Sequence, residues 1–192
     1  MVLAPFRTGS FLRSHSMMAM ANVRNGSKSS RFFVMLSPKV EFMSITSDDP
    51  FLQAAIEEAK KGLAEGGIPI GSVLVVDGQI IGRGHNRRVQ RGSAILHAEM
   101  DAIESAGRLR AGDYRRAILY STLSPCDMCS GAALLYGIPR FVIGENRTFR
   151  GPEDYVRSRG VNLEVVDDPE CVRLMEDFIR SQPSLWNEDI GE

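Results

Sequence analysis

Two short segments, His97-Ala98-Glu99 and Pro125-Cys126-Asp127-Met128-Cys129, constrain the fold of this sequence more than any other feature. Together they supply one imidazole, two thiols and a carboxylate, and the first thiol lies 27 residues after the carboxylate. Zinc binds His nitrogen and Cys sulfur in a tetrahedron, and a catalytic zinc site keeps its fourth position for water. Any fold must therefore bring the two segments together, and a set of three protein ligands indicates catalytic rather than structural zinc.

Both segments are predicted to open helices, one over Leu96–Ala106 and one over Cys126–Tyr136, with a Gly after each as its stop. The two thiols lie one helical turn apart on one side, and the free N–H groups at a helix start favour thiolate. His97 and Glu99 project in different directions, so His97 can bind metal while Glu99 flanks the open position. One metal between two helix N-termini would then join these helices across the sheet.

Other side chains could complete a four-ligand structural site, namely Cys171, His85 and His15. Cys171 falls at the start of the last predicted helix, where a buried core thiol is expected. His85 ends a predicted strand, where a packing or loop role is expected. The combined H-x-E and P-C-x-x-C pattern is instead the signature of zinc nucleoside and nucleobase deaminases, in which the Glu carries protons and does not bind the metal. The alternative is a non-enzymatic binding module stabilised by zinc. Glu99 argues against this alternative, because a structural site has no use for a carboxylate that does not bind the metal.

Strand and helix patterns alternate along the chain, which indicates an α/β fold. A capped helix runs from Pro50 to Leu63, and Asp77-Gly78 favours a hairpin turn. We predict a three-layer α/β/α sandwich around a mixed sheet of about five strands. The predicted strands are Ile70–Val76, Gln79–Gly82, Ala117–Thr122, Arg140–Ile143 and Val161–Val166, with further helices at Pro152–Arg159 and Pro169–Gln182. The tail Pro183–Glu192 shows no regular pattern and holds the only Trp.

Charge is distributed unevenly along the 192 residues. Residues 1–40 carry six basic residues and no acid, which leaves 17 basic and 24 acidic residues in the remaining 152, a net charge of −7. Such an acidic body is poorly matched to nucleic acid, since Lys and Arg supply most of that affinity. Small molecules are the expected partners.

We predict two regions, an N-terminal extension at 1–45 and a zinc-dependent deaminase domain at 46–192. The extension is a targeting segment, a disordered tail, or sequence upstream of a true start at Met43. Three Cys make no even disulfide framework, and no apolar run approaches the roughly 20 residues of a membrane span. We therefore expect a cytoplasmic protein without membrane attachment, with the nucleus as a second compartment, or a mitochondrial one if residues 1–40 are a transit peptide.

Several further segments resemble the fungal-type cytosine deaminases of the cytidine and deoxycytidylate deaminase superfamily. The resemblance runs from about Asp49 to the C-terminus and rests on Gly82-Arg83-Gly84-His85-Asn86, Gly92–His97, Thr122–Cys129, Tyr136–Arg140, Gly144-Glu145-Asn146 and Glu188–Glu192. It implies a cytidine deaminase-like fold, a homodimer, and hydrolysis of free cytosine to uracil and ammonia in pyrimidine salvage. Zinc-held hydroxide would attack C4 while Glu99 shuttles protons. The alternatives are another small-molecule base or nucleoside deaminase, or a tRNA adenosine deaminase.

The resemblance also implies site residues. One zinc ion per subunit would bind His97, Cys126 and Cys129, and Glu99 would be the catalytic residue. Asn86 would hydrogen-bond the edge of the pyrimidine, and Asp189 would hold its opposite side. Ser124 would lie against the base near the zinc, and Ala98 would offer its backbone N–H. The apolar walls and the lid would be formed by Ile70, Phe149 and Trp186.

The sequence departs from the family at Ala98, where the family has Gly, but Ala keeps the backbone N–H. The hairpin turn is about two residues shorter than in the family, and residues 1–40 have no counterpart there. Without the resemblance, Asn86 could simply end a strand, Phe149 anchor a loop and Trp186 pin the tail.

Overall fold

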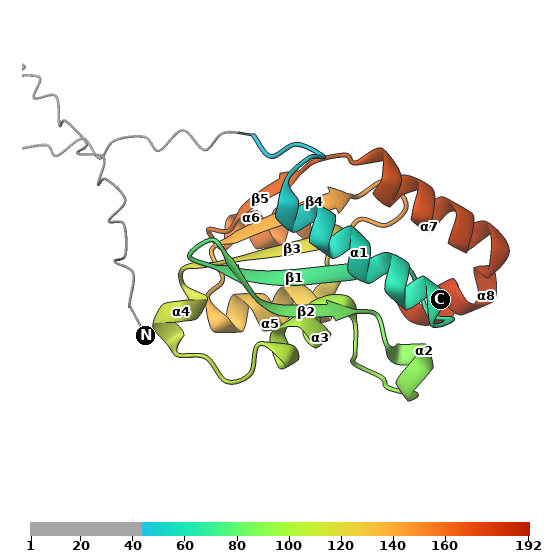
Figure 1. Ribbon diagram of the computed structural model, residues 1–192, viewed down its shortest axis with the longest axis horizontal. Helices are drawn as coiled ribbons and strands as arrows, with labels where there is room; N and C mark the ends of the chain where they lie inside the picture. The colour runs from blue at the N-terminus through green and yellow to red at the C-terminus, as the bar shows by residue number, and fades with distance from the viewer. Residues whose placement is uncertain (1–43) are drawn as a thin grey trace, which may run out of the picture. The chain divides into compact units, whose positions relative to one another are not determined.

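The computed structural model describes residues 44–192, so residues 1–43 of the predicted N-terminal extension lie outside the described residues (Figure 1). Five strands form one sheet in the order β2-β1-β3-β4-β5. Their bounds are Gly71–Val76 (β1), Gln79–His85 (β2), Ala117–Leu123 (β3), Arg140–Glu145 (β4) and Asn162–Val165 (β5). Strand β1 runs antiparallel to β2 and β3, whereas β3, β4 and β5 are parallel, so the sheet is mixed as predicted.

Local sequence signals explain where the main elements begin and end. Helix α1 (Pro50–Ala64) starts where the Asp49 carboxylate accepts hydrogen bonds from two backbone N–H groups. The β1–β2 hairpin turns at Asp77 and Gly78, which both have positive φ (51° and 76°), as a two-residue turn requires. Helix α5 (Asp127–Tyr136) ends at Gly137 in the left-handed conformation. These predictions are confirmed.

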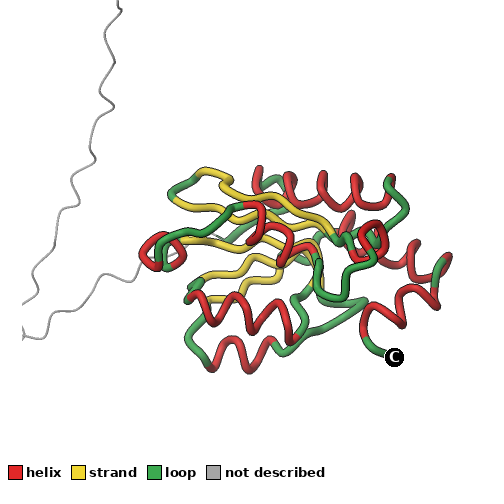
Figure 2. Tube along the Cα trace, turned by 90° about the horizontal axis from the view of Figure 1, so that it is seen from below, coloured by secondary structure: helices red, strands yellow, loops and turns green. Residues whose placement is uncertain are grey.

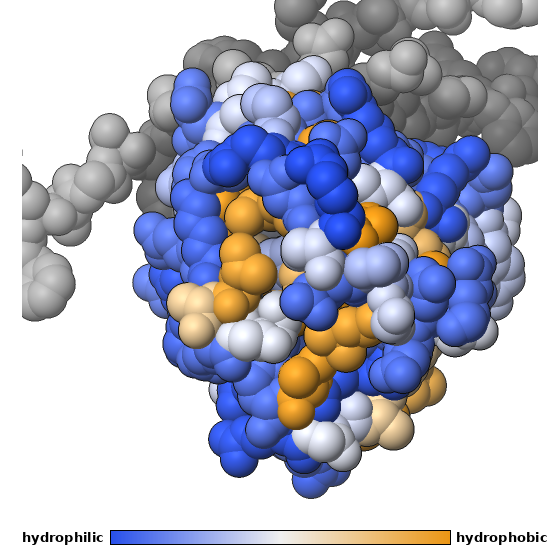
Figure 3. All heavy atoms as spheres, turned by 90° about the vertical axis from the view of Figure 1, so that its right-hand side faces the viewer, coloured by the Kyte–Doolittle hydropathy of each residue, from blue (hydrophilic) through white to orange (hydrophobic). Residues whose placement is uncertain are grey.

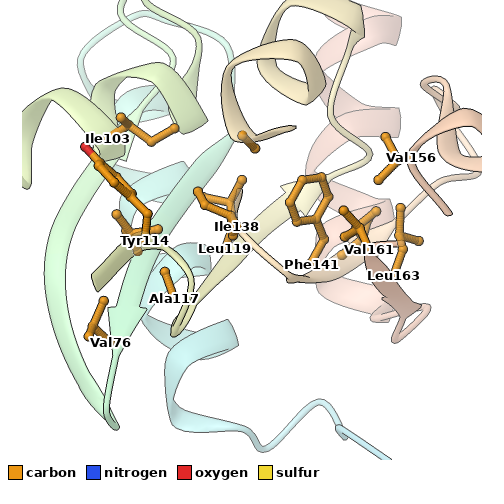
Figure 4. Close-up of a cluster of buried hydrophobic side chains, with 13 residues drawn as sticks. Val76, Ile103, Tyr114, Ala117, Leu119, Ile138, Phe141, Val156, Val161 and Leu163 are labelled. Carbon is orange, nitrogen blue, oxygen red and sulfur yellow. The ribbon is translucent and has the colours of Figure 1, made fainter. Parts of the chain in front are cut away.

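Helices cover both faces of the sheet (Figure 2). On one face, α1 and α7 (Pro169–Ser181) pack on strand residues such as Val73 and Tyr120. On the other, α3 (Ala98–Ser105), α5 and α6 (Glu153–Ser158) cover a core that includes Ile103, Leu119 and Phe141 (Figure 4). The α/β/α sandwich is thus confirmed, but the two helices that carry the predicted metal ligands lie on the same face and not across the sheet from each other.

Glycines in β2 let α3 approach the sheet closely. A Cβ on Gly82 would lie 2.1 Å from the carbonyl oxygen of Ala102, and one on Gly84 would lie 2.4 Å from the Ala102 nitrogen. Since real Cβ atoms do not approach backbone atoms that closely, both strand positions require Gly. This contact fixes the height of α3 above the sheet and hence the position of His97 at its start.

Three helices differ from the sequence prediction. The tail expected to be irregular contains α8 (Pro183–Ile190), which has Pro in its first turn and Gly191 after it at φ 82°. Only Trp186 of α8 is buried, so its apolar periodicity is weak, although the Pro and Gly signals were present. Two single turns, α2 (Arg88–Arg91) and α4 (Ala111–Tyr114), lie in segments expected to be loops. No helix among residues 44–192 is long and apolar enough to cross a membrane.

Candidate active site

One edge of the sheet collects the site residues. Strands β2, β3 and β4 end at this edge, and β1 begins there, as the pairings Gly71 with His85 and Leu123 with Glu145 show. The segments that follow these strands, together with the start of β1, therefore converge. At the sheet end, the Asn86 N–H donates to the carbonyl of Ile70 (2.9 Å), which brings the predicted residues before β1 and after β2 into contact.

The three predicted metal ligands come together at two helix starts. His97 is the N-cap of α3, Cys126 is the N-cap of α5, and Cys129 lies in the first turn of α5. One donor atom from each lies within 4.8 Å of the others, and the Cys126 Sγ lies 3.5 Å from the His97 Nδ1. One imidazole nitrogen and two thiols form the donor set of a three-ligand zinc site. The residues present therefore fit zinc.

Electrostatics within the cluster favour a charged sulfur beside a charged ring. Hydrogen bonds from Cys129 and His97 lower the pKa of the Cys126 thiol to about 4. The pKa of Cys129 is raised well above its ordinary value, because it donates to Cys126 and is buried. Burial lowers the pKa of His97, but the Cys126 bond and the charges of Glu99 and Cys126 outweigh burial and raise it. A thiolate is the form that binds metal.

Glu99 lies beside these groups, and its carboxylate does not face solvent. Its exposed fraction is 3%, and Ser121 donates a hydrogen bond to its Oε1 (3.0 Å). Burial, and next the negative charge of Cys126, raise the pKa of Glu99. A buried carboxyl group with a raised pKa holds a proton more readily than an exposed one, which suits an acid–base role.

Apolar residues form one wall next to the cluster. Ile70, Ala98 and Trp186 belong to one buried hydrophobic cluster, and Phe149 packs against it. The Phe149 and Trp186 rings meet edge to face at 6.0 Å between centroids. Ala98 is the first residue of α3, where the N–H has no acceptor within the helix. The structure thus places together four residues that were predicted as substrate contacts, and their contact with substrate stays a prediction.

Asn86 and Asp189 also meet, although they are 103 residues apart. The Asn86 Nδ2 donates to the Asp189 Oδ2 (3.1 Å), and Asn86 has no exposed surface. Sequence reasoning missed Arg88, whose Nη1 donates to the other carboxylate oxygen (2.7 Å). The position of Arg88 two residues after Asn86 does not predict this contact, because the contact depends on where the fold places α8.

Figure 3 shows the face of the molecule that includes α2 and α8, where hydrophobic patches lie among hydrophilic side chains.

Ser124 makes contacts that the sequence did not indicate. Its hydroxyl donates to the Glu153 Oε1 (3.0 Å) and accepts from the Gly151 N–H (3.1 Å). The hydroxyl proton of Ser124 is therefore directed to Glu153, and its contact with a substrate nucleobase stays a prediction. Glu153 is a buried acid in the first turn of the short helix α6.

The other candidate ligands lie away from the cluster. His85 is buried and its ring nitrogens face Glu58 (3.1 Å) and Glu65 (3.0 Å), so its packing role is confirmed. Cys171 belongs to α7 and is buried in the core on the side facing the sheet, and burial raises the pKa of its thiol far above the usual range. His15 lies outside the described residues.

The fold and the three-donor centre define a class: α/β/α proteins with a zinc site built for deamination. Residues 45–145 match the family model described as the cytidine and deoxycytidylate deaminase zinc-binding region. A cytosine deaminase of Candida albicans is 51% identical over 146 residues, which cover 76% of this chain and 97% of that protein. The chain therefore belongs to the cytidine and deoxycytidylate deaminase family, and the predicted resemblance is confirmed.

More distant relatives share the fold. A tRNA-specific adenosine deaminase of Streptococcus pyogenes is 38% identical over 148 residues, covering 71% of this chain and 92% of that protein. A solved structure from a study of A-to-I editing by tRNA:A34 deaminases superposes with a TM-score of 0.55 at 27% identity, covering 65% of this chain and 97% of that chain. The sequence and fold of this chain are thus shared with relatives named for different substrates, cytosine and tRNA.

Proposed function

We propose that this protein hydrolyses free cytosine to uracil and ammonia, a reaction of pyrimidine salvage, within a domain spanning residues 46–192. The observation that carries the proposal is the buried carboxylate of Glu99 beside the His97, Cys126 and Cys129 cluster. The 51% identity to the Candida albicans cytosine deaminase supports the choice of base.

His97, Cys126 and Cys129 would hold one zinc ion. When bound, zinc lowers the pKa of water from about 15.7 toward 7, so that a nucleophile exists at neutral pH. Glu99 would accept the proton of that water and deliver it to ring N3, then to the departing amine. The C4–N bond breaks and a C4–O bond forms, so the reaction needs water and no oxidant. Burial of Glu99 keeps its proton transfers inside the site.

The remaining residues would orient the base and exclude water. The resemblance implies that Asp189 holds the side of the ring opposite Asn86, but the two side chains are hydrogen-bonded to each other (3.1 Å) and would offer an amide and a carboxylate to the same side of the ring. The Ala98 N–H is a further donor. Phe149 and Trp186 would close over the apolar side, which strengthens polar contacts inside. The net charge of −7 over residues 41–192 supports a small substrate over nucleic acid.

We also propose that the protein is a homodimer. The exposed hydrophobic side chains Leu135 (80%), Tyr155 (53%) and Tyr136 (40%) belong to α5 and α6. Leu135 and Tyr155 line a groove of about 280 Å³. Exposed apolar patches mark interaction sites, and a second copy would cover this one. Leu135→Asp is expected to yield monomers, as light scattering would show; a variant that stays dimeric would rule this face out.

We place the protein in the cytoplasm, because its two site thiols must stay reduced to bind metal. Mass spectrometry of the N-terminus of the native protein tests whether residues 1–40 are retained or removed on import. A native N-terminus near residue 40 would indicate either import into an organelle with removal of the preceding residues or a translation start further along the sequence.

The reaction is tested by incubating the purified zinc-loaded protein separately with cytosine, cytidine, adenine, guanine and tRNA, and measuring ammonia. We expect release from cytosine. Release from cytidine or tRNA but not from cytosine would replace the proposed substrate.

The role of Glu99 is tested with Glu99→Gln. We expect one equivalent of zinc to remain bound while turnover falls by about 10²–10⁴-fold or more, the usual contribution of a general acid–base group. Turnover near that of the parent protein would refute the assigned role.

A further inference from the structure

Arg88, a residue that the proposed chemistry does not use, closes a ring of hydrogen bonds between the sheet edge and the C-terminal helix. Its backbone N–H donates to the Asn86 Oδ1 (3.1 Å), and the Asn86 Nδ2 donates to the Asp189 Oδ2 (3.1 Å). The Arg88 Nη1 then donates to the Asp189 Oδ1 (2.7 Å). Each oxygen of the Asp189 carboxylate therefore has its own donor, and the carboxylate plane is fixed.

The same guanidinium also binds the main chain of α8. Arg88 Nη1 donates to the Asp189 carbonyl oxygen (3.0 Å), which lies in the last turn of that helix. Carbonyl groups in the last turn of a helix have no partner within the helix and carry its negative end, so a cation there stabilises the helix. One Arg88 nitrogen thus holds both the side chain and the backbone of Asp189.

Apart from the hydrogen bonds of Asp189, α8 is attached through Trp186 and the partly buried side chains of Leu185 and Ile190. It has eight residues, too few for a stable isolated helix, and Trp186 is its one buried residue. The Asp189 side chain is only 5% exposed, whereas that of Arg88 is 26% exposed. A carboxylate this deeply buried is costly once its cationic partner is removed, because Asn86 alone cannot balance its charge. Without Arg88, the last turn of α8 would move so that Asp189 reaches water.

We propose that Arg88 is a positioning residue that holds Asp189 and the α8 helix against the site, and so determines affinity for the base. The proposal rests on the proposed function, since it deepens the role of Asp189 in binding cytosine. Arg88 itself does not need to touch the substrate. Arg88 is the first residue of α2, a short helix that Figure 1 shows below the end of α8.

The test compares Arg88→Met, which keeps the aliphatic stem, with Arg91→Met. Arg91 is exposed on the same short helix and its side chain makes no hydrogen bond or ion pair within residues 44–192, so it is a matched control. Trp186 is the only Trp of the chain, so its fluorescence reports on α8 whether or not the protein is active. We expect R88M to red-shift the emission of Trp186 and increase its quenching by acrylamide, with zinc content unchanged and R91M like the parent.

In kinetics, we expect R88M to raise KM for cytosine by about tenfold or more, the equivalent of one lost charge-assisted contact, with kcat within about threefold. Arg88→Lys should recover most of the KM. Combining R88M with Asp189→Asn should raise KM no further than Asp189→Asn alone.

An unchanged Trp186 signal and KM in R88M would overturn the proposal. A raised KM with an unchanged Trp186 signal would also overturn it, because Arg88 would then act on the substrate directly. If the parent protein releases no ammonia from cytosine, the proposed function fails, while the Trp186 signal still decides whether Arg88 holds α8.

Discussion

Glu153 offers a quantitative test of how the site is held together. Its carboxylate is buried and accepts hydrogen bonds from the Ser124 hydroxyl (3.0 Å), the Asn146 amide (2.9 Å) and the Arg157 guanidinium (3.1 Å). Ser124 precedes Cys126 by two residues, and Asn146 begins the loop that carries Phe149. One side chain thus connects α6, a segment leading to the metal cluster and the loop of the aromatic wall. We expect Glu153→Gln to weaken all three connections.

The magnitude follows from the geometry. A Gln oxygen can still accept from Ser124 and Asn146, but its NH₂ group then faces Arg157, which is also a donor. One hydrogen bond to a charged group, worth about 1.5–3 kcal/mol, is lost, and the 40% exposure of Arg157 reduces this to about 1–2 kcal/mol. The two bonds that remain now go to a neutral acceptor and weaken by about 0.5 kcal/mol each. The sum is about 2–3 kcal/mol, or about 4–12 °C in Tm for a domain of this size.

Thermal unfolding followed by circular dichroism measures this change, and zinc content is determined alongside. The control is Asp154→Asn, the neighbouring acid on α6, whose side chain is 84% exposed; its Tm should change by about 1 °C or less. A loss below about 0.5 kcal/mol in E153Q, or an equal loss in both variants, would refute the argument that the buried carboxylate joins these segments.

The same variant gives a pH dependence of known sign. Burial alone raises the pKa of Glu153, but the bonds from Asn146, Ser124 and Arg157 together outweigh burial, and the pKa is lowered. A lowered pKa in the folded state contributes stability above the ordinary Glu value of about 4.3, and this stability is lost as pH falls through the lowered pKa. The gap in unfolding free energy between parent and E153Q should therefore be constant above about pH 5.5 and shrink below about pH 4. A gap that grows on acidification would contradict this assignment.

Two further outcomes are expected from the geometry. Cys129→Ser should lose most of its zinc at stoichiometric loading, since it leaves one thiol and one imidazole; a full zinc complement by atomic absorption would argue against ligation. Gly84→Ala should lower Tm strongly, by about 5 °C or more, and reduce zinc affinity, because its Cβ would meet the backbone of α3, whereas Gly112→Ala, with its nearest contact at 3.9 Å, should leave both unchanged. Equal Tm values for these two variants would show that the close approach of α3 does not matter.

Sequence reasoning reached the parts of the site whose residue types carry their own chemistry. His97, Cys126 and Cys129 could be grouped from donor type and spacing, and the structure places their donor atoms within 4.8 Å. The five strands were found because apolar runs and the Asp77-Gly78 turn are local signals. Helix α8 was missed because one buried Trp makes no periodic pattern.

The contacts of Ser124 show what local signals cannot give. The family resemblance implies a substrate contact for Ser124, and the structure adds that its hydroxyl proton goes to Glu153, which lies 29 residues further along the chain. The partners of the Glu153 carboxylate depend on how α6 packs against the rest of the domain. The residue type and the position of Glu153 in the sequence do not predict that packing. For the same reason Arg88 could not be distinguished from Arg91 before α8 was placed.

The strand order explains why residues so far apart in sequence meet at one edge. Strand β1 enters the sheet where β2 leaves it, because the two form a hairpin, and it is antiparallel to β3, so β3 also leaves at that edge. Parallel pairing then brings the end of β4 to the same place. Site residues follow shortly after the end of each of these strands. Asn86 follows β2, Ser124 and Cys126 follow β3, and the loop that contains Phe149 follows β4. His97 starts α3, which follows α2 in the chain, and α3 and α5 pack on the same face of the sheet, so the metal ligands at their starts lie on that face. The C-terminal helix folds back to the same edge and brings Asp189 to Asn86.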